Sequence, residues 1–292
     1  MNKLDFYKIY NQHLMYLDNW GYEEWHGKRA DFSNKDLSYM NFSYMNLEGG
    51  FFVGTNFCNG FLNTVNLSHA NLEGTDLTDA TFYNVNLTNA RLKNTKMDET
   101  ILHDSDLSKA ILRNARICGV EVNHSTFVET TFENVEMCGV RFFDTNLFKT
   151  DFKNAEIKDS NFNDSDLRGV NFKDAFLEGV SFRNVDLRKV DFEGATLVDV
   201  EFVDVNLKEV DFSKTKVFMD VYFKNTDLSD SNFEQKDILN VNFGNSNLSH
   251  SNFERANLSD VNFKDADIYK INLKDTKLTD VDLGFIKLNS NK

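Results

Sequence analysis

From residue 30 almost to its end, this chain places a large apolar residue at every fifth position. Leu187, Phe192, Leu197, Phe202 and Leu207 show the spacing in one stretch. An α-helix repeats its environment every 3.6 residues and a β-strand every two, so neither element gives a period of five. The sequence therefore requires a backbone that repeats its own conformation every five residues, which indicates an internally repeated architecture.

We call the large apolar residue of each repeat its centre. Centres run in register from Phe32 to Val217 and, after one extra residue, from Phe223 to Leu288, which gives 52 repeats. Two positions before the centre, 44 of the 52 repeats have Ala, Val, Ser or Thr, which suits a crowded inward site. Two positions after it, 33 have Gly, Asn or Asp, which best tolerate the positive φ of tight turns. Each repeat is thus expected to be a short extended step followed by a corner.

The types of centre predict how many repeats complete one turn. Numbering four sides from Phe32, 18 of the 20 central Phe residues fall on the first and third sides. A coil of four repeats explains this distribution, although two repeats per turn would also fit the alternation. Four repeats are favoured because successive right-angle corners close after four. The 52 repeats then predict about 13 coils.

Two stretches carry a recognisable motif, Ala70-Asn71-Leu72-Glu73-Gly74 and Ala256-Asn257-Leu258-Ser259-Asp260. This pattern resembles the pentapeptide-repeat family. The resemblance implies an all-β fold, a right-handed quadrilateral parallel β-helix with the centre and the small residue pointing inward. It covers nearly all of the chain after residue 29 and informs architecture rather than function.

The ends of a stacked solenoid need caps. We expect residues 1–29 to form a cap helix over 3–18 and a linker containing Trp20 and Trp25, and residues 30–292 to form the β-helix. The helix face predicted to pack inward consists of Leu4, Tyr7, Tyr10, Leu14 and Leu17. At the other end, either Phe285 and Ile286 fold over the last coil or two molecules meet there in a homodimer.

The extra residue lies within KVFMDVYF, residues 216–223, and is expected as a bulge near 218–220. On the second side, Val198, Phe218 and Leu239 each follow a centre in consecutive coils. Together with Met219 they would form an outward apolar stripe. Solvent-facing positions have little reason to be apolar in series, so we interpret the stripe as a partner-binding site, with coincidence as the alternative.

Charge and composition limit the possible partners. The net charge of −14 argues against direct binding of nucleic acid or an anionic membrane. No apolar run is long enough to span a membrane, and the N-terminus lacks the apolar core of a signal peptide. Three Cys residues without close spacing give no sign of a disulfide framework. We therefore expect a cytoplasmic protein.

Catalysis is not indicated. Neither nucleotide-binding loops nor a nucleophile elbow is present, and we expect no catalytic residue, cofactor or metal. Cys118 and Cys138 follow centres one coil apart and could be neighbours, but a metal site would need more ligands. A regular convex surface also offers no pocket in which acidic pairs could be desolvated.

Two binding roles remain. The first, which we prefer, is a non-enzymatic scaffold that binds an unidentified protein partner through its outer faces. The second is an acidic DNA mimic acting on DNA gyrase or another topoisomerase, as the family's quinolone-resistance members imply. Its candidate residues lie on the second side, which is the most acidic: Asp76, Asp79, Asp98, Glu99, Glu156 and Asp159. Lys and Arg interrupt this series, and duplex DNA carries a denser charge of about one per 1.7 Å.

Overall fold

The computed structural model describes residues 1–18 and 27–282 and shows a parallel β-solenoid preceded by one helix. Strand residues pair in parallel with residues 20 positions later: Phe61 with Thr81, and Thr81 with Ile101. This register confirms four repeats per turn and excludes two. The described part of the solenoid makes about 11 turns, slightly fewer than the 13 expected.

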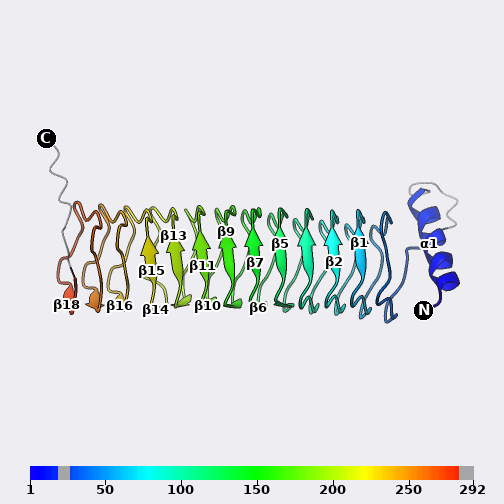
Figure 1. Ribbon diagram of the computed structural model, residues 1–292, viewed down its shortest axis with the longest axis horizontal. Helices are drawn as coiled ribbons and strands as arrows, with labels where there is room; N and C mark the ends of the chain where they lie inside the picture. The colour runs from blue at the N-terminus through cyan, green and yellow to red at the C-terminus, as the bar shows by residue number, and fades with distance from the viewer. Residues whose placement is uncertain (19–26, 283–292) are drawn as a thin grey trace. The chain divides into compact units, whose positions relative to one another are not determined.

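The chain divides into two compact parts, Met1–Glu136 and Met137–Lys292. In the first part, β1, β2, β3 and β5 pair in that order (Figure 1). Its elements are α1 (Lys3–Asp18), β1 (Phe61–Asn63), β2 (Thr81–Tyr83), β3 (Ile101–His103), β4 (Arg116–Cys118) and β5 (Glu121–Asn123). Other repeats contribute isolated parallel bridges, such as Asn66 with Asn86.

The second part has two ladders of short parallel strands, and Figure 1 shows those of the third side next to one another. The third side contains β7 (Arg141–Phe143), β9 (Asn161–Asn163), β11 (Ser181–Arg183), β13 (Glu201–Val203) and β15 (Tyr222–Lys224). The second side contains β8 (Glu156–Lys158), β10 (Phe176–Glu178), β12 (Thr196–Val198), β14 (Val217–Met219), β16 (Asp237–Leu239), β17 (Asn257–Ser259) and β18 (Lys277–Thr279). Strand β6 (Glu136–Cys138) includes residues of both parts.

Two columns of stacked Phe rings fill the core of the second part. On the third side, Phe162 stacks on Phe182 at 5.1 Å between ring centroids, and Phe182 stacks on Phe202 at 5.2 Å. On the first side, Phe192 lies between Phe172 and Phe212 at 5.6 and 5.7 Å. Rings of the two columns meet edge to face, a favourable geometry for aromatic pairs. The alternation of Phe centres along the sequence thus becomes continuous stacking in space.

The corners confirm the predicted turn chemistry. Apart from Lys214, next to the extra residue, the residue two positions after the centre has positive φ in the described coils, for example 57° at Asn59 and 66° at Gly74. The Asn or Asp before the centre stabilises the same turn, because its side-chain oxygen accepts the N–H two residues later. Asn66 accepts from Ser68 at 3.0 Å, and its amide donates to Asn46 of the previous coil at 3.0 Å. One residue type therefore fixes both the turn and the stacking.

Helix α1 has the predicted bounds, but the predicted packing face is partly wrong: Tyr10, Leu14 and Leu17 are half-buried, whereas Leu4 and Tyr7 are exposed. Leu4 is 80% exposed, whereas Phe6, His13 and Tyr16 are buried. The ring of Phe6 stacks on the first centre, Phe32, at 5.0 Å. A flat aromatic ring continues the column of core rings, which explains why Phe6 rather than Leu4 covers it. The linker residues Trp20 and Trp25 lie outside the described residues, as do Phe285 and Ile286.

The extra residue lies slightly earlier than predicted, and this changes which side chain points inward. The N–H groups of Lys216 and Val217 both point at the carbonyl of Ala195, at 2.7 and 3.5 Å, which is a bulge. Leu197 then pairs with Phe218, and Phe218 is 2% exposed. The expectation that Phe218 faces outward is therefore wrong, because Phe218 replaces Val217 as the centre.

Lys236 compensates for the bulge in the next coil. It occupies the inward position that usually holds a small residue, and it is buried. Its ammonium group donates to the carbonyl oxygen of Thr215, beside the bulge. Burial lowers the pKa of Lys236. An unusual sequence position thus has a structural role, since its donor satisfies a buried acceptor.

We predict that Phe192→Asp destabilises the protein by about 4 kcal/mol or more, because it places an unpaired charge between stacked rings. Thermal or denaturant unfolding measures the change. The matched control is Phe61→Asp, at a Phe that is 42% exposed and should tolerate the charge with little loss. Equal unfolding midpoints for the two variants would contradict the inward assignment of the centres.

We also predict that the packing of α1 weakens in mild acid. The backbone N–H of Ala30 donates to His13 Nδ1 at 3.1 Å, which requires that this nitrogen carry no proton. Burial, followed by the charge of Arg29, lowers the pKa of His13, while Glu48 raises it. The unfolded histidine has a pKa of about 6.5, so the stabilisation is complete above that pH and is lost as the pH falls below it.

Hydrogen exchange of residues 3–18 at about pH 7.5 and about pH 5.5, corrected for intrinsic rates, measures this effect. Protection should fall at the lower pH. His13→Phe should remove the pH dependence, whereas His250→Gln should leave it unchanged. Equal protection of α1 in the wild type at both pH values would refute the role of His13.

Candidate functional site

The predicted apolar stripe on the second side is present, but it consists of Val198, Met219 and Leu239 without Phe218. Strand pairing places Val198 beside Met219, and Met219 beside Leu239, on β12, β14 and β16. Val198 and Met219 are half-buried and Leu239 is 43% exposed. Phe218 leaves the stripe because it belongs to the core, so Met219 takes its place in the ladder. Polar residues lie at both ends, since Val198 pairs with Glu178 and Leu239 with Ser259.

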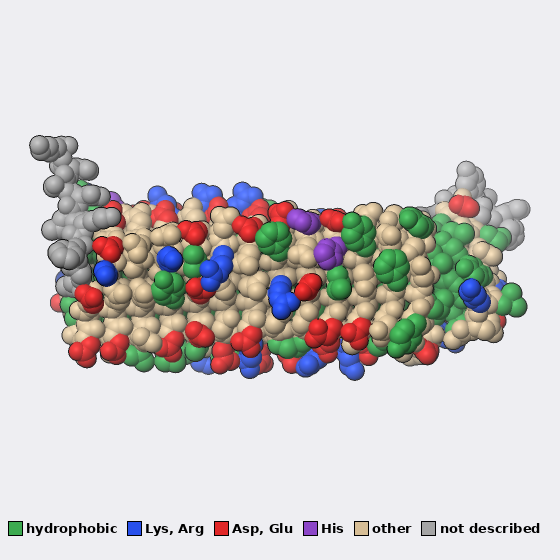
Figure 2. Space-filling model, viewed as in Figure 1, with side chains coloured by type: hydrophobic (Ala, Val, Ile, Leu, Met, Phe, Trp, Pro, Cys, Tyr) green, Lys and Arg blue, Asp and Glu red, His purple; other side chains and the backbone are tan. Residues whose placement is uncertain are grey.

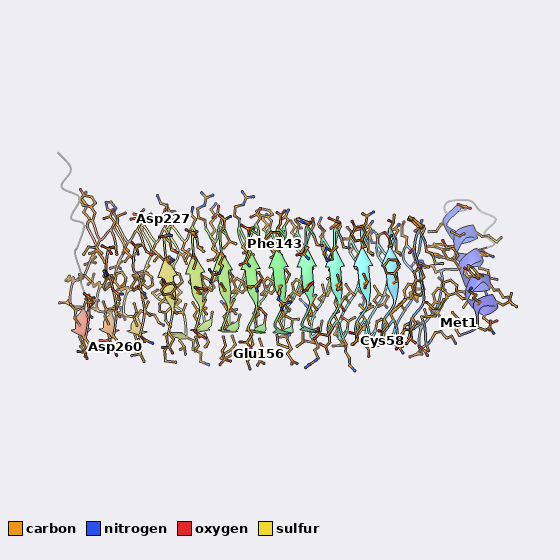
Figure 3. All side chains as sticks on the ribbon, in the orientation of Figure 1. Met1, Cys58, Phe143, Glu156, Asp227 and Asp260 are labelled. Carbon is orange, nitrogen blue, oxygen red and sulfur yellow. The ribbon has the colours of Figure 1, made fainter. Side chains whose placement is uncertain are left out.

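The acidic residues of the second side are partly neutralised. Asp76 lies 3.9 Å from Lys96, Asp98 accepts a hydrogen bond from Arg116 at 2.9 Å, and Glu156 pairs with Lys158 at 2.6 Å. Burial acts to raise the pKa of Asp76, but hydrogen bonds from Thr78 and Cys58 together lower it. Figure 3 shows Glu156 projecting outward from β8.

The remaining acidic candidates lie at corners. Asp79, Glu99 and Asp159 have φ of 57°, 55° and 50°, and their side chains are exposed. Figure 2 faces the third side and shows red and blue side chains interspersed there. The mixture weakens the comparison with the regular charge of duplex DNA.

The structure contains a basic groove that the sequence did not predict. It encloses about 610 Å³ on the fourth side of the second part, and Phe148, Lys149, Arg168, Gly169, Arg188 and Lys189 line it. Lys208 and Glu209 close its C-terminal end. Counting net charge over a whole side hid the groove, because Asp166 and Asp186 cancel the two arginines. The signal that could have found it is the recurrence of Lys and Arg at 20-residue intervals.

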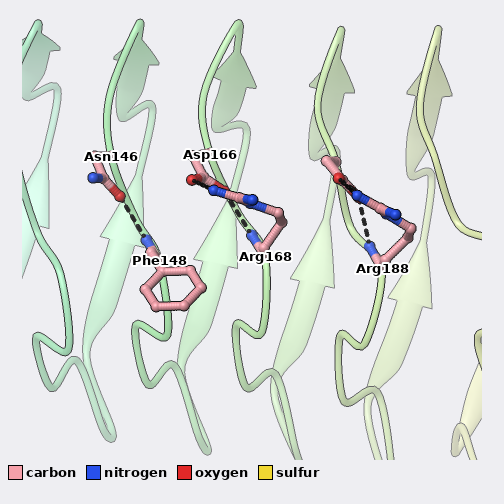
Figure 4. A network of polar contacts seen from close by, with 6 residues as sticks. Asn146, Phe148, Asp166, Arg168 and Arg188 are labelled. Atoms are coloured by element: carbon pink, nitrogen blue, oxygen red, sulfur yellow. Dashed lines mark hydrogen bonds and ion pairs between the residues drawn. The ribbon is translucent and has the colours of Figure 1, made fainter.

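Each arginine of the groove is held by an acidic residue two positions earlier (Figure 4). Arg168 Nε and Nη2 donate to Asp166 at 2.8 and 2.6 Å, and Arg188 makes the corresponding bonds to Asp186 at 3.0 and 2.6 Å. These hydrogen bonds lower the pKa of both carboxyl groups. The guanidinium groups therefore have fixed positions one coil apart.

Comparison with known protein families agrees with the repeated coil of the structure. A model described as a pentapeptide repeat region matches residues 135–212 and 216–291. A model of pentapeptide repeats in eight copies matches residues 62–98 and 86–123. The chain belongs to the pentapeptide-repeat family.

Several solved structures are similar to this pentapeptide-repeat protein. HetL, which is involved in heterocyst differentiation regulation in the cyanobacterium Nostoc sp. strain PCC 7120, is 18% identical with a TM-score of 0.34, covering 92% of this chain and 97% of HetL. QnrB1, a plasmid-mediated fluoroquinolone resistance protein, is 16% identical with a TM-score of 0.33, covering 65% and 94%. Rfr23 from the cyanobacterium Cyanothece 51142 is 18% identical with a TM-score of 0.15, covering 56% and 89%. No curated protein matches. Likenesses this distant carry no argument about a partner.

The cysteines differ from expectation. Cys118 and Cys138 are disulfide-bonded, so the expectation of a chain without disulfides is wrong, whereas Cys58 is free. Burial and then Asp76 raise the pKa of Cys58 to about 11, which keeps this thiol protonated and unreactive at neutral pH.

Two kinds of feature are absent from the described ranges, 1–18 and 27–282. No group of three or more His, Cys, Asp or Glu side chains there is arranged to hold a metal ion. The same residues contain no helix with the length and apolar character of a membrane span.

Proposed function

We propose that this pentapeptide-repeat protein is a non-enzymatic scaffold that binds a protein partner through its outer surface. The observation that carries the proposal is the in-register ladder of Val198, Met219 and Leu239. Stacked coils hold these side chains at fixed positions, so a partner would pay little entropy to order them. Backbone stacking consumes the polar groups of the coils, which leaves outward side chains as the variable part of the molecule.

The stripe has the character of a small contact centre. Its three apolar side chains are bounded by Glu178 and Ser259, an apolar middle with polar neighbours, which resembles the anatomy of protein interfaces. An acidic DNA mimic that binds DNA gyrase is the alternative. The pairing of Asp76, Asp98 and Glu156 with Lys or Arg weighs against it, because paired carboxylates present less net charge to a DNA-binding surface.

Homodimerisation through the C-terminal coil is part of the same proposal. Leu278 is 48% exposed although it is a centre, whereas Leu258, one coil earlier, is 1% exposed. A second copy meeting this coil would cover that apolar surface.

We predict that Met219→Ser combined with Leu239→Ser removes the partner while leaving the fold intact. Affinity capture from the native cell, followed by identification of the captured proteins, compares this variant with the wild type. The matched control is Ile101→Ser combined with Ile111→Ser, two exposed apolar residues outside the stripe. Phe218 is unsuitable for this test because it is buried.

The expected result is a partner captured by the wild type and the control variant but not by the stripe variant. If the stripe variant still captured the partner, the stripe would not be the partner-binding surface. DNA gyrase among proteins that the stripe variant still captures, with inhibition of supercoiling by purified protein, would instead establish the alternative.

A further inference from the structure

We propose that the basic groove binds a short acidic peptide segment of a partner protein in an extended conformation. The inference rests on the proposed scaffold function and names the chemistry that a second surface recognises. The groove and the apolar stripe lie on different sides of the coil, so each can be tested without the other.

Free cations lie on both sides of Gly169. Arg168, Arg188 and Lys208 have carboxylate partners. By contrast, no ion pair of Lys149 or Lys189 occurs among the described residues. These two lysines occupy corners two coils apart, which is about 10 Å. In a protein with a net charge of −14, two unpaired lysines at one hollow form a local attraction for an anion.

The hollow exists because one corner lacks a side chain. Lys149, Gly169, Lys189 and Glu209 are successive corners of the same edge, with φ of 56°, 70°, 64° and 63°. Side chains are therefore compatible with this conformation, and Gly169 is not required for it. A Cβ at Gly169 would lie 3.5 Å from the nearest atom, Lys149 Cγ, which is ordinary contact. The glycine thus opens space between the lysines without a need imposed by the backbone.

The other walls suit a peptide. The ring of Phe148 lies 5.2 Å from Lys149 Nζ and 5.7 Å from Arg168 Cζ, so an apolar surface adjoins the cations. Aspartates hold both guanidinium groups in place, so little side-chain entropy is lost when a ligand contacts them. In an extended segment, carboxylates on alternate residues lie about 7 Å apart, within reach of two flexible lysines, and the intervening side chains face away.

The charges at and beyond the C-terminal end of the groove favour a short peptide over nucleic acid. Along the same edge, the corner after Lys189 is Glu209, and the next is Asp230, which lies 3.6 Å from Lys208. A phosphate backbone carries charge at every nucleotide, so one that continued past the lysines would meet Glu209 at the C-terminal end of the groove and Asp230 beyond it. A short acidic segment can place its charges only where the lysines are.

The test measures fluorescence anisotropy of a labelled short peptide that alternates Glu with Val, titrated with the full-length protein. The matched peptide has Gln in place of each Glu. We expect binding of the Glu peptide only, with loss of affinity as ionic strength rises from about 0.01 to about 0.15 M and the Debye length falls from about 30 to about 8 Å.

Two variants locate the site. Lys149→Glu combined with Lys189→Glu should lower the affinity for the Glu peptide by about tenfold or more. Gly169→Asn should do the same by filling the hollow, while thermal unfolding stays close to that of the wild type, because Asn is common at these corners. The control is Lys109→Glu combined with Lys270→Glu, two corner lysines of the fourth side outside the groove with the same charge change.

No binding of the Glu peptide at up to about 1 mM protein would overturn the proposal. So would equal affinity in the groove variant and the control variant. Binding of a short oligothymidylate or of inorganic phosphate in preference to the peptide would assign the groove to phosphate instead. Unchanged peptide binding by Met219→Ser with Leu239→Ser would show that the groove acts independently of the stripe, so failure of either surface is distinguishable.

Discussion

The backbone hydrogen bonds between successive coils are the interaction on which the structure depends. Thr196 N donates to the carbonyl oxygen of Ala175 at 2.9 Å, and Phe172 N donates to the backbone carbonyl oxygen of Asp191 at 2.8 Å. This pattern recurs every 20 residues. These bonds satisfy buried backbone groups only if every coil has the same length. The 20-residue repeat follows from that requirement.

Where one coil has an extra residue, the same requirement explains the response. Lys216 and Val217 share one acceptor, Phe218 moves into the core, and Lys236 donates to Thr215 from the next coil. Register is restored by Phe223, which pairs with Phe202. The insertion therefore alters local packing and leaves the ladder of the third side unchanged. The proposed binding surfaces consist of outward side chains, which the backbone hydrogen bonds between coils do not constrain.

Most of the fold could be predicted from the sequence because period, small inward residues and corner types all follow from stacking. The orientation of Phe218 could not, because Val217 and Phe218 are both acceptable centres and only the three-dimensional bulge decides between them. The face of α1 was missed for a related reason: Phe6 packs on Phe32 by ring stacking, which helical spacing does not encode.

The candidate sites were less predictable than the fold. Val198, Met219 and Leu239 were found because their register follows from the period, although Phe218 was wrongly included. The basic groove was missed because it depends on an absent side chain at Gly169 and on Asp166 and Asp186 turning toward their arginines. In a net-charge count the two Asp–Arg pairs cancel to zero. The structure, by contrast, distinguishes these paired arginines from Lys149 and Lys189, which have no ion pair among the described residues.

The most direct test of the stacked 20-residue coil is pulsed electron paramagnetic resonance between nitroxides at equivalent corners of the second part. Cys substituted for Asn154 and Gln235, four coils apart in the hydrogen-bond ladder, and for Asn154 and Asp275, six coils apart, would carry the labels, with Cys58 replaced by Ser. Stacking predicts separations of about 19 and about 29 Å, an increase of about 4.8 Å per coil. Separations near twice these values, or without proportion to the number of coils, would contradict the account.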